Sequence, residues 1–288
     1  MKLNIVPAST GWLWVKLGMR TFIRQPLAMS GLFFMFMGVV SLLSTIPVVG
    51  SAISLALLPA ATLGLMTAAR QASDGKFPMP TVLASAFSAG KQRMHAMLKL
   101  GALYAAGFLL LLGMTTLVDG GDFAGVYLLG NPLTEELASE PGFQQAAWLG
   151  MLLYLPFAML FWHAPALVHW HDVAPVKSLF FSIMACWKNK TALLVYMVCW
   201  LGVFMTAGVA MSLISALIGS TSLANVLVFP LVLVMASMFF TSTYYTFRDS
   251  FMDDGPADQG EPPLLKRDSE GRFVLTDSPT DQGQKPPN

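Results

Sequence analysis

ALLVYMVCWLGVFMTAGVAMSLI, residues 192–214, runs for 23 residues without a charged side chain. About 20 consecutive apolar residues in a helix are enough to cross the hydrocarbon core of a bilayer. Five further runs of similar character occur, so the sequence predicts an all-α membrane protein with six spans. The expected boundaries are 27–49, 52–69, 96–118, 146–168, 192–214 and 223–246. The second run is the shortest and contains Pro59.

The composition of the chain agrees with this class. Of 288 residues, 55% are hydrophobic and only 11% are charged, with a mean hydropathy of +0.61 and a net charge of +1. Soluble domains carry about 25% charged residues, so the composition argues against a soluble enzyme, a disordered scaffold and a nucleic-acid-binding protein. Two cysteines, Cys186 and Cys199, are too few for a disulfide framework.

The distribution of basic residues predicts the orientation. Lysine and arginine occur before the first span, between the second and third, between the fourth and fifth, and after the sixth. None occurs at positions 100–176, where the longest loop on the opposite side carries acidic residues instead. Because basic loops stay in the cytoplasm, we expect both termini to be cytoplasmic in a multi-pass protein.

The sequence divides into a membrane domain, residues 1–247, and a tail, residues 248–288. The tail is rich in proline and acidic residues and poor in aromatic ones. Such a segment buries too little apolar surface to order itself, so we expect a disordered cytoplasmic tail. Residues 264–267 and 272–275 are candidates for a short docking motif within it.

A short amphipathic segment precedes each odd-numbered span. The first, residues 12–24, places Trp12, Val15, Met19 and Phe22 on one expected helical face, and residues 80–94 and 176–190 have a similar texture. Amphipathic helices with flanking cations lie in the headgroup region of a membrane. We therefore expect the basic residues of these segments to contact anionic headgroups: Lys16, Arg20, Arg24, Lys91, Arg93, Lys188 and Lys190.

Each even-numbered span contains a proline: Pro59, Pro156 and Pro230. The chain is thus expected to form three antiparallel hairpins, each made of a lead-in helix, a span and a proline-bearing return span. Helices broken by proline can line a solute site, because freed carbonyls bind cations or polar groups. A simple kink repaired by neighbouring helices explains the same residues.

The opening of the chain also resembles a known group of proteins. Gly11-Trp12-Leu13-Trp14-Val15-Lys16, Arg24-Gln25-Pro26-Leu27 and Pro47-Val48-Val49-Gly50 are similar to the start of an uncharacterised family of bacterial six-span integral membrane proteins. The resemblance is best over the first 70 residues. It implies a location in the bacterial inner membrane, and it carries over no catalytic residue.

One cluster raises the question of a metal site. His163, His169, His171 and Asp172 follow one another near the end of the fourth span, and imidazole and carboxylate groups bind first-row metals. Their spacing is poor for a shared ion, because His169 and His171 point to different sides of a helix and Pro165 disturbs the turn before them. An interfacial helix end anchored by tryptophan explains the same residues.

The remaining functional expectations follow from the catalytic and cofactor-binding motifs that the sequence lacks. No phosphate-binding loop, dinucleotide fingerprint or nucleophile elbow occurs, so we expect neither an enzyme nor a cofactor. The leading hypothesis is an organising, regulatory or assembly protein that works through membrane lipids and a protein partner or a second copy, without nucleic acid. The alternative is a transporter or channel for a small or amphipathic solute, with a cavity between the proline-bearing hairpins.

Overall fold

The computed structural model describes residues 2–46, 49–218, 221–252, 265–267 and 273–275. The chain divides into two units, Met1–Met252 and Asp253–Asn288. Pro47 and Val48, from the Pro47-Val48-Val49-Gly50 stretch quoted above, and most of the predicted tail, including Leu264 and Arg272, lie outside the described residues.

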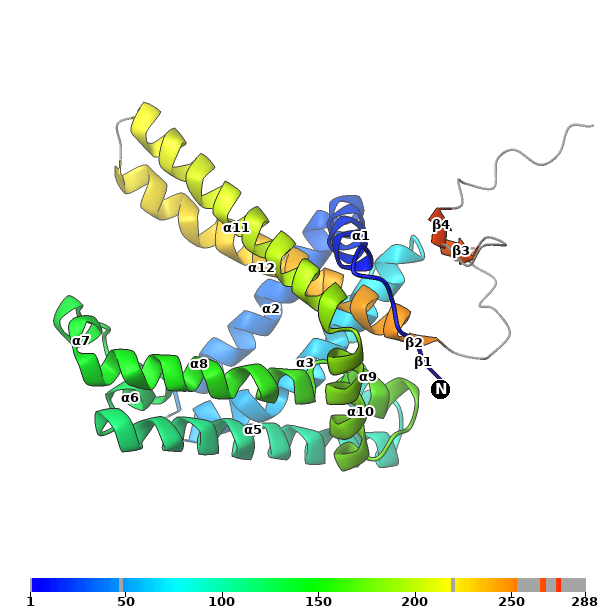
Figure 1. Cartoon of the computed structure of the whole chain (residues 1–288), viewed down its shortest axis with the longest axis horizontal. Helices are drawn as coiled ribbons and strands as arrows, with labels where there is room; N and C mark the ends of the chain where they lie inside the picture. Colours follow the sequence, from blue (N-terminus) through cyan, green and yellow to red (C-terminus); the bar gives the residue numbers. More distant parts are fainter. Residues whose placement is uncertain (1, 47–48, 219–220, 253–264, 268–272, 276–288) are drawn as a thin grey trace, which may run out of the picture. The chain divides into compact units, whose positions relative to one another are not determined.

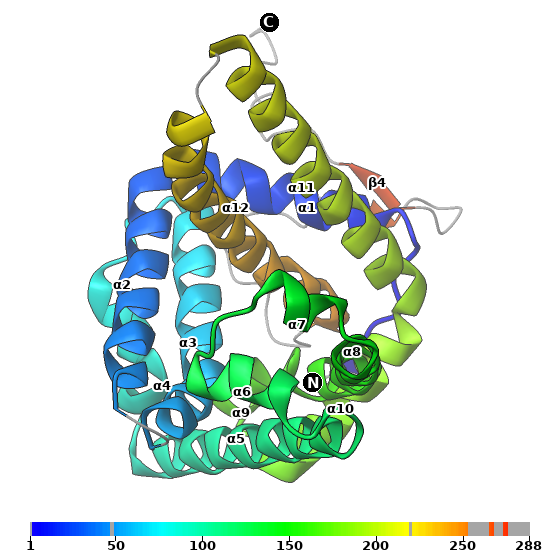
Figure 2. The same ribbon diagram turned by 90° about the vertical axis from the view of Figure 1, so that its left-hand side faces the viewer.

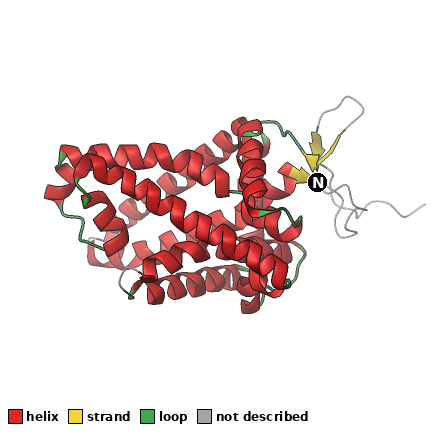
Figure 3. Ribbon diagram, turned by 90° about the horizontal axis from the view of Figure 1, so that it is seen from below, coloured by secondary structure: helices red, strands yellow, loops and turns green. Residues whose placement is uncertain are grey.

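Helices make up nearly all of the described part of the first unit (Figure 3). They are α1 (Thr10–Arg24), α2 (Pro26–Ser44), α3 (Val49–Ser73), α4 (Ser85–Ser88), α5 (Lys91–Asp119), α6 (Asp122–Leu129), α7 (Glu135–Ser139), α8 (Pro141–Phe161), α9 (Ala164–Trp170), α10 (Pro175–Lys188), α11 (Lys190–Ile218) and α12 (Thr221–Ser250), with a 3₁₀ turn η1 (Pro80–Ala84) before α4.

The predicted all-α membrane fold with six spans is confirmed. Six helical segments of the described chain are long and apolar enough to cross a bilayer: α2, α3, α5, α8 with α9, α11 and α12. Apart from α3, half of whose most apolar window is buried, the spans leave most of their apolar surface exposed, and only 17% of the window of α11 is buried inside the protein. This is expected of helices whose outward faces contact lipid rather than other helices.

Two predicted boundaries are wrong around prolines. The first span ends at Ser44 rather than at position 49, since Pro47 disfavours a helical conformation in the residue before it. The second span, predicted to be the shortest, is 25 residues long against 19 for α2. Pro59 lies inside α3 without ending it, because neighbouring helices bury that part of the chain.

The fourth span is not the single helix that was predicted. Helix α8 ends at Phe161, and α9 begins at Ala164 after a break at Trp162 and His163. Pro165 explains the break, since its ring would clash with the carbonyl group of the residue four positions earlier. The sixth span also differs, because α12 continues to Ser250 and therefore carries Arg248 and Asp249, which had been assigned to the tail.

Helix α3 holds a central position among the spans. It packs against α2, α5 and α12, while α5 packs against α8 and α12 packs against α11 (Figures 1 and 2). Aromatic rings join α5 to α8, with the centroids of Tyr104 and Phe161 4.9 Å apart. Trp162 connects the end of α8 to the other side of the unit, 6.2 Å from the ring of Tyr196 in α11 and 6.2 Å from that of Phe239 in α12.

The strands of the described chain form two short antiparallel pairs. In the first unit, β1 (Lys2–Leu3) pairs with β2 (Phe251–Met252), so the N-terminal segment lies beside the residues that follow α12. In the second unit, β3 (Leu265–Arg267) pairs with β4 (Phe273–Leu275). These strands fall within the two segments of the tail that the sequence singles out as docking motifs.

Candidate functional site: the basic end of the membrane unit

Helix α1 crosses two spans at very short range. A Cβ atom built on Gly11 would lie 2.2 Å from the backbone oxygen of Ala192 in α11, and one built on Gly18 would lie 2.2 Å from Cβ of Ser242 in α12. These glycines are seven residues apart, so they lie on the same face of the helix. Only a residue without a side chain allows this approach, and α1 is therefore packed directly against the spans.

The prediction of the buried face of α1 is wrong, because the face that is buried is rotated slightly around the helix from the predicted one. Trp12 is 52% exposed, while Trp14, Val15 and Phe22 are buried. The buried face follows the two glycines, a signal that a search for large apolar residues misses. The basic side of the helix is where it was expected, and Lys16, Arg20 and Arg24 are exposed.

Helix α10 turns its large apolar side chains away from the protein. Val176, Phe180 and Trp187 are 70%, 59% and 61% exposed. The buried face is made of small residues instead: Ser178, Ser182, Ala185 and Cys186. Lys188 and Lys190 are exposed at the end of this helix and the start of the next, with Nζ of Lys190 5.0 Å from the centroid of the Trp187 ring.

The segment between the second and third spans does not form the continuous lead-in helix that was predicted. Helix α4 ends at Ser88, and Gly90, with a φ of +100°, separates it from α5. A left-handed backbone of this kind favours glycine and stops a helix. Lys91 and Arg93 therefore lie on α5, where Lys91 is exposed and Nε of Arg93 lies 3.9 Å from Oδ1 of Asp172.

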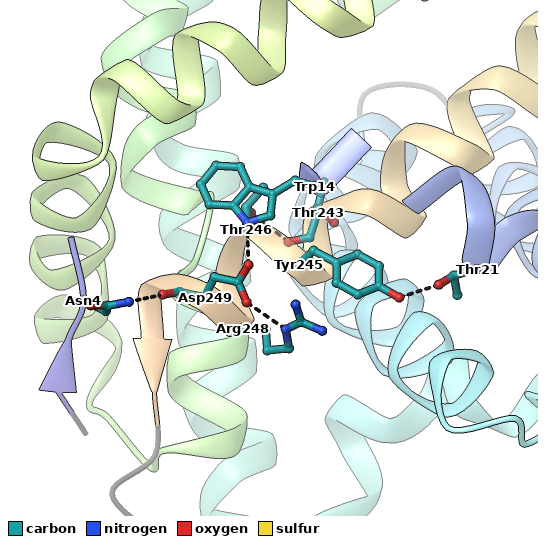
Figure 4. A network of polar contacts seen from close by, with 8 residues as sticks. All are labelled: Asn4, Trp14, Thr21, Thr243, Tyr245, Thr246, Arg248 and Asp249. Carbon is teal, nitrogen blue, oxygen red and sulfur yellow. Dashed lines mark hydrogen bonds and ion pairs between the residues drawn. The ribbon is translucent and has the colours of Figure 1, made fainter. Parts of the chain in front are cut away.

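A network of polar contacts joins α1 and the N-terminal segment to the end of α12 (Figure 4). Asp249 accepts a hydrogen bond from Nε1 of Trp14 at 2.9 Å and from Nε of Arg248 at 2.8 Å. The Thr21 hydroxyl contacts the Tyr245 hydroxyl, which ties α1 to α12 a second time. The sequence gives one clue to this network, since an adjacent arginine and aspartate follow an apolar run and need partners there.

Asn189 connects three segments that are distant in sequence. Its Oδ1 accepts a hydrogen bond from the backbone amide of Val6, and its Nδ2 donates to the backbone oxygen of Asn4 and to the hydroxyl of Ser250. The side chain is buried, so these contacts replace water entirely. The N-terminal segment is thereby fixed to the start of α11 and the end of α12.

The histidine cluster does not assemble around a common point. His163 is buried against the rings of Phe247 and Phe251, while Asp172 pairs with Arg93. His171 packs beside Phe247 at 5.8 Å between ring centroids, and His169 is partly exposed. No group of three possible metal ligands lies together within the described part of the chain.

The three prolines occupy different environments. Pro59 is buried in α3, whereas Pro156 in α8 and Pro230 in α12 are exposed on the surfaces of their helices. A shared solute site would place their freed carbonyls around one polar space. The structure gives the transport hypothesis no such common environment at these prolines.

The buried thiol of Cys186 allows a direct check on the packing of α10. Its Sγ donates toward the backbone oxygen of Met159 at 3.8 Å, and burial raises the pKa of this thiol to about 12. Because only the thiolate reacts, we expect maleimide labelling of Cys186 at pH 8 in a Cys199→Ser variant to be about a thousandfold slower than in the unfolded chain. Labelling will increase tenfold with each pH unit from 8 to 10. A folded protein that reacts as fast as the unfolded one would contradict the described packing.

Comparison with known proteins identifies a relative of this chain. The chain is 36% identical over 267 residues to a protein of Burkholderia thailandensis described as a probable inner membrane protein, covering 92% of this chain and 98% of the relative. The chain belongs to this family of inner membrane proteins. The multi-pass class predicted from the apolar runs is confirmed, and so is the resemblance to a family of bacterial inner membrane proteins. No family model matches the chain. No solved structure matches it either.

Proposed function

We propose that the protein acts without catalysis, as an organising or assembly component that binds anionic lipid at the cytoplasmic face of the inner membrane. The observation that carries this proposal is the exposed surface of α10 together with that of α1. On α10, Val176, Phe180 and Trp187 face outward next to Lys188 and Lys190. Aromatic residues beside cations are typical of a surface that lies at the boundary between headgroups and acyl chains.

The exposed surface of α1 has the same character. Lys16, Arg20 and Arg24 repeat every four residues along the helix, beside Trp12 and Ile23, which is 68% exposed. A basic residue near an anionic membrane surface contributes about 1 kcal/mol of binding free energy. The exposed cations of α1 and α10 together would hold anionic lipid around this end of the protein.

Native mass spectrometry of protein extracted with its lipids tests the proposal. The Lys188→Gln, Lys190→Gln double variant is expected to weaken retention of phosphatidylglycerol about 30-fold, since two cations contribute about 2 kcal/mol. The matched control is Lys99→Gln, which removes an exposed cation from α5 outside this surface. Phosphatidylcholine, which carries no net charge, should be retained equally by all three proteins.

Two results would contradict the proposal. One is equal retention of phosphatidylglycerol by the double variant and the wild type. The other is a loss of the same size in Lys99→Gln, because net charge alone would then explain the effect. A solute flux into vesicles that depends on the protein would favour transport instead.

A further inference from the structure

A short helix folds back at the end of the membrane unit opposite its basic end. Helix α5 ends at Asp119, and the φ values of the next two residues, Gly120 and Gly121, are +73° and +115°. A left-handed backbone of this kind favours glycine and lets the chain reverse direction within two residues. Helix α6 therefore lies beside the end of α5 and against α8 (Figures 1 and 2).

Polar contacts fix α6 at both of its ends. The backbone amide of Gly121 donates to Oδ1 of Asp119 at 2.9 Å, and that of Phe123 donates to Oδ2 of the same side chain at 2.6 Å. These amides belong to the start of a helix, where no carbonyl group of the helix itself is available to them. At the other end, the hydroxyl of Ser51 in α3 donates to the backbone oxygen of Leu128 at 3.1 Å. Because α6 is held to both α5 and α3, the side that it turns outward is also fixed.

The inward side of α6 reaches between the spans. A Cβ atom built on Gly150 of α8 would lie 3.1 Å from Cε1 of Phe123 and 3.5 Å from Cγ2 of Thr115 in α5. Gly150 lies well inside α8, roughly 13 Å from the first residue of that helix at 1.5 Å per residue. The ring of Phe123 also lies 5.7 Å from that of Phe143, between centroids. Helix α6 is therefore packed at the depth of the spans and not above their ends.

The outward side of this segment carries large apolar side chains. Tyr127 and Leu129 in α6 are 62% and 67% exposed, and Leu133, in the turn that follows, is 58% exposed. The turn is folded against the helix, because the backbone amide of Asn131 donates to the backbone oxygen of Gly125 at 3.3 Å. We call Tyr127, Leu129 and Leu133 the α6 surface. Water is a poor solvent for an apolar surface of this kind.

The surroundings of the α6 surface favour acyl chains over lipid headgroups. Leu117 in the last turns of α5 and Trp148 in α8 are also exposed, so the helices that hold α6 present apolar side chains as well. Tyrosine and tryptophan are enriched where the hydrocarbon core meets the headgroups. No lysine or arginine occurs at positions 100–176, and the charged residues in and around α6 and α7 are exposed carboxylates: Asp122, Glu135, Glu136 and Glu140. Carboxylates do not attract anionic headgroups.

We propose that α6 is embedded in the bilayer and that the α6 surface contacts the acyl chains of the leaflet at this end of the protein. The occupant follows from continuity, since α6 packs on α5 and α8, two spans whose own apolar surfaces face lipid. Residues 122–133 then belong to the membrane domain and not to a loop in water. The proposal is independent of the proposed function, because it concerns the other end of the spans and no basic residue.

Nitroxide spin labels on single cysteines test the proposal. The labels are placed by Tyr127→Cys, Leu129→Cys and Leu133→Cys in a Cys186→Ser, Cys199→Ser background, and the protein is reconstituted into vesicles of phosphatidylethanolamine and phosphatidylglycerol. Electron paramagnetic resonance then gives the collision rate of each label with oxygen, which concentrates in hydrocarbon, and with a water-soluble nickel complex.

Two exposed positions give the reference values. Leu152→Cys, on the surface of α8, reports contact with acyl chains, and Glu136→Cys, in α7, reports contact with water. We expect the ratio of oxygen to nickel collisions at the α6 surface to match that at Leu152→Cys. It should exceed that at Glu136→Cys about tenfold, because hydrocarbon excludes a polar complex.

Two outcomes would overturn the proposal. A ratio at the α6 surface equal to that at Glu136→Cys would place α6 in water. Few collisions with either reagent would show that a second copy of the chain or another protein covers the surface instead of lipid. Thermal unfolding is recorded for each labelled protein, and if one of the three substitutions destabilises the fold, the other two positions decide. Retention of phosphatidylglycerol by the α10 lysines is measured separately, so either proposal can fail without the other.

Discussion

Replacing Gly18 with alanine is expected to lower the free energy of unfolding by about 3 kcal/mol, the upper range for inserting atoms into a packed region. The added Cβ would lie 2.2 Å from Cβ of Ser242 and 2.7 Å from its Cα, and neither atom belongs to a flexible side-chain end. Helix α1 must therefore move away from α12. Thermal unfolding of the purified protein in detergent measures the change.

Gly202→Ala is the matched control for this substitution. Gly202 also lies in a helix, but a Cβ atom built on it meets nothing within 4 Å. Alanine is favoured over glycine in a helix by about 1 kcal/mol, so this variant should be as stable as the wild type or more stable. If both variants unfold at the same temperature, α1 does not pack against α12 as described.

Replacing Asp249 with alanine is expected to lower the free energy of unfolding by about 2 kcal/mol. The substitution removes the acceptor of both the Trp14 indole and the Arg248 guanidinium group. Loss of one partner from a fully buried ion pair costs about 3–5 kcal/mol, and the value is smaller here because the Arg248 side chain is 37% exposed. The midpoint of thermal unfolding should fall accordingly.

Asp249→Asn separates the two contributions to this loss. An asparagine oxygen still accepts a hydrogen bond from Trp14 but carries no charge for Arg248, so its stability should lie between those of the wild type and Asp249→Ala. Asp122→Ala, at an exposed position in α6, should leave stability within about 0.5 kcal/mol of the wild type. An Asp249→Ala protein as stable as Asp122→Ala would show that the network in Figure 4 does not hold α1 to α12.

The spans could be predicted because their signal is local. A run such as residues 192–214 has the length and polarity of a membrane helix whatever surrounds it. The boundaries near Pro47 and Pro165 were less predictable, because a proline can end a helix, kink it or lie inside it, and neighbouring helices decide which. Pro59 illustrates the last of these outcomes.

The contacts around Asp249 could not be predicted, because they join residues that are distant in sequence. Trp14 and Asp249 are separated by 235 positions, and Asn189 is separated from Val6 by 183. Composition and periodicity describe one helix at a time, and they do not show which helices meet. The buried face of α1 was predicted wrongly for the same reason. Large apolar residues were taken to mark that face, whereas glycines mark it where α1 crosses other helices, and the sequence of one helix does not show where such a crossing lies.

Sided cysteine labelling shows whether the basic end of the membrane unit faces the cytoplasm. Single cysteines are placed by Glu136→Cys in α7 and by Lys177→Cys in α10, both exposed, in a Cys186→Ser, Cys199→Ser background. A membrane-impermeant maleimide applied to intact spheroplasts is predicted to label the Glu136→Cys protein at once and the Lys177→Cys protein only after the membrane is disrupted. Immediate labelling of Lys177→Cys with protection of Glu136→Cys would contradict this orientation, because the basic surfaces of α1 and α10 would then face away from the cytoplasm.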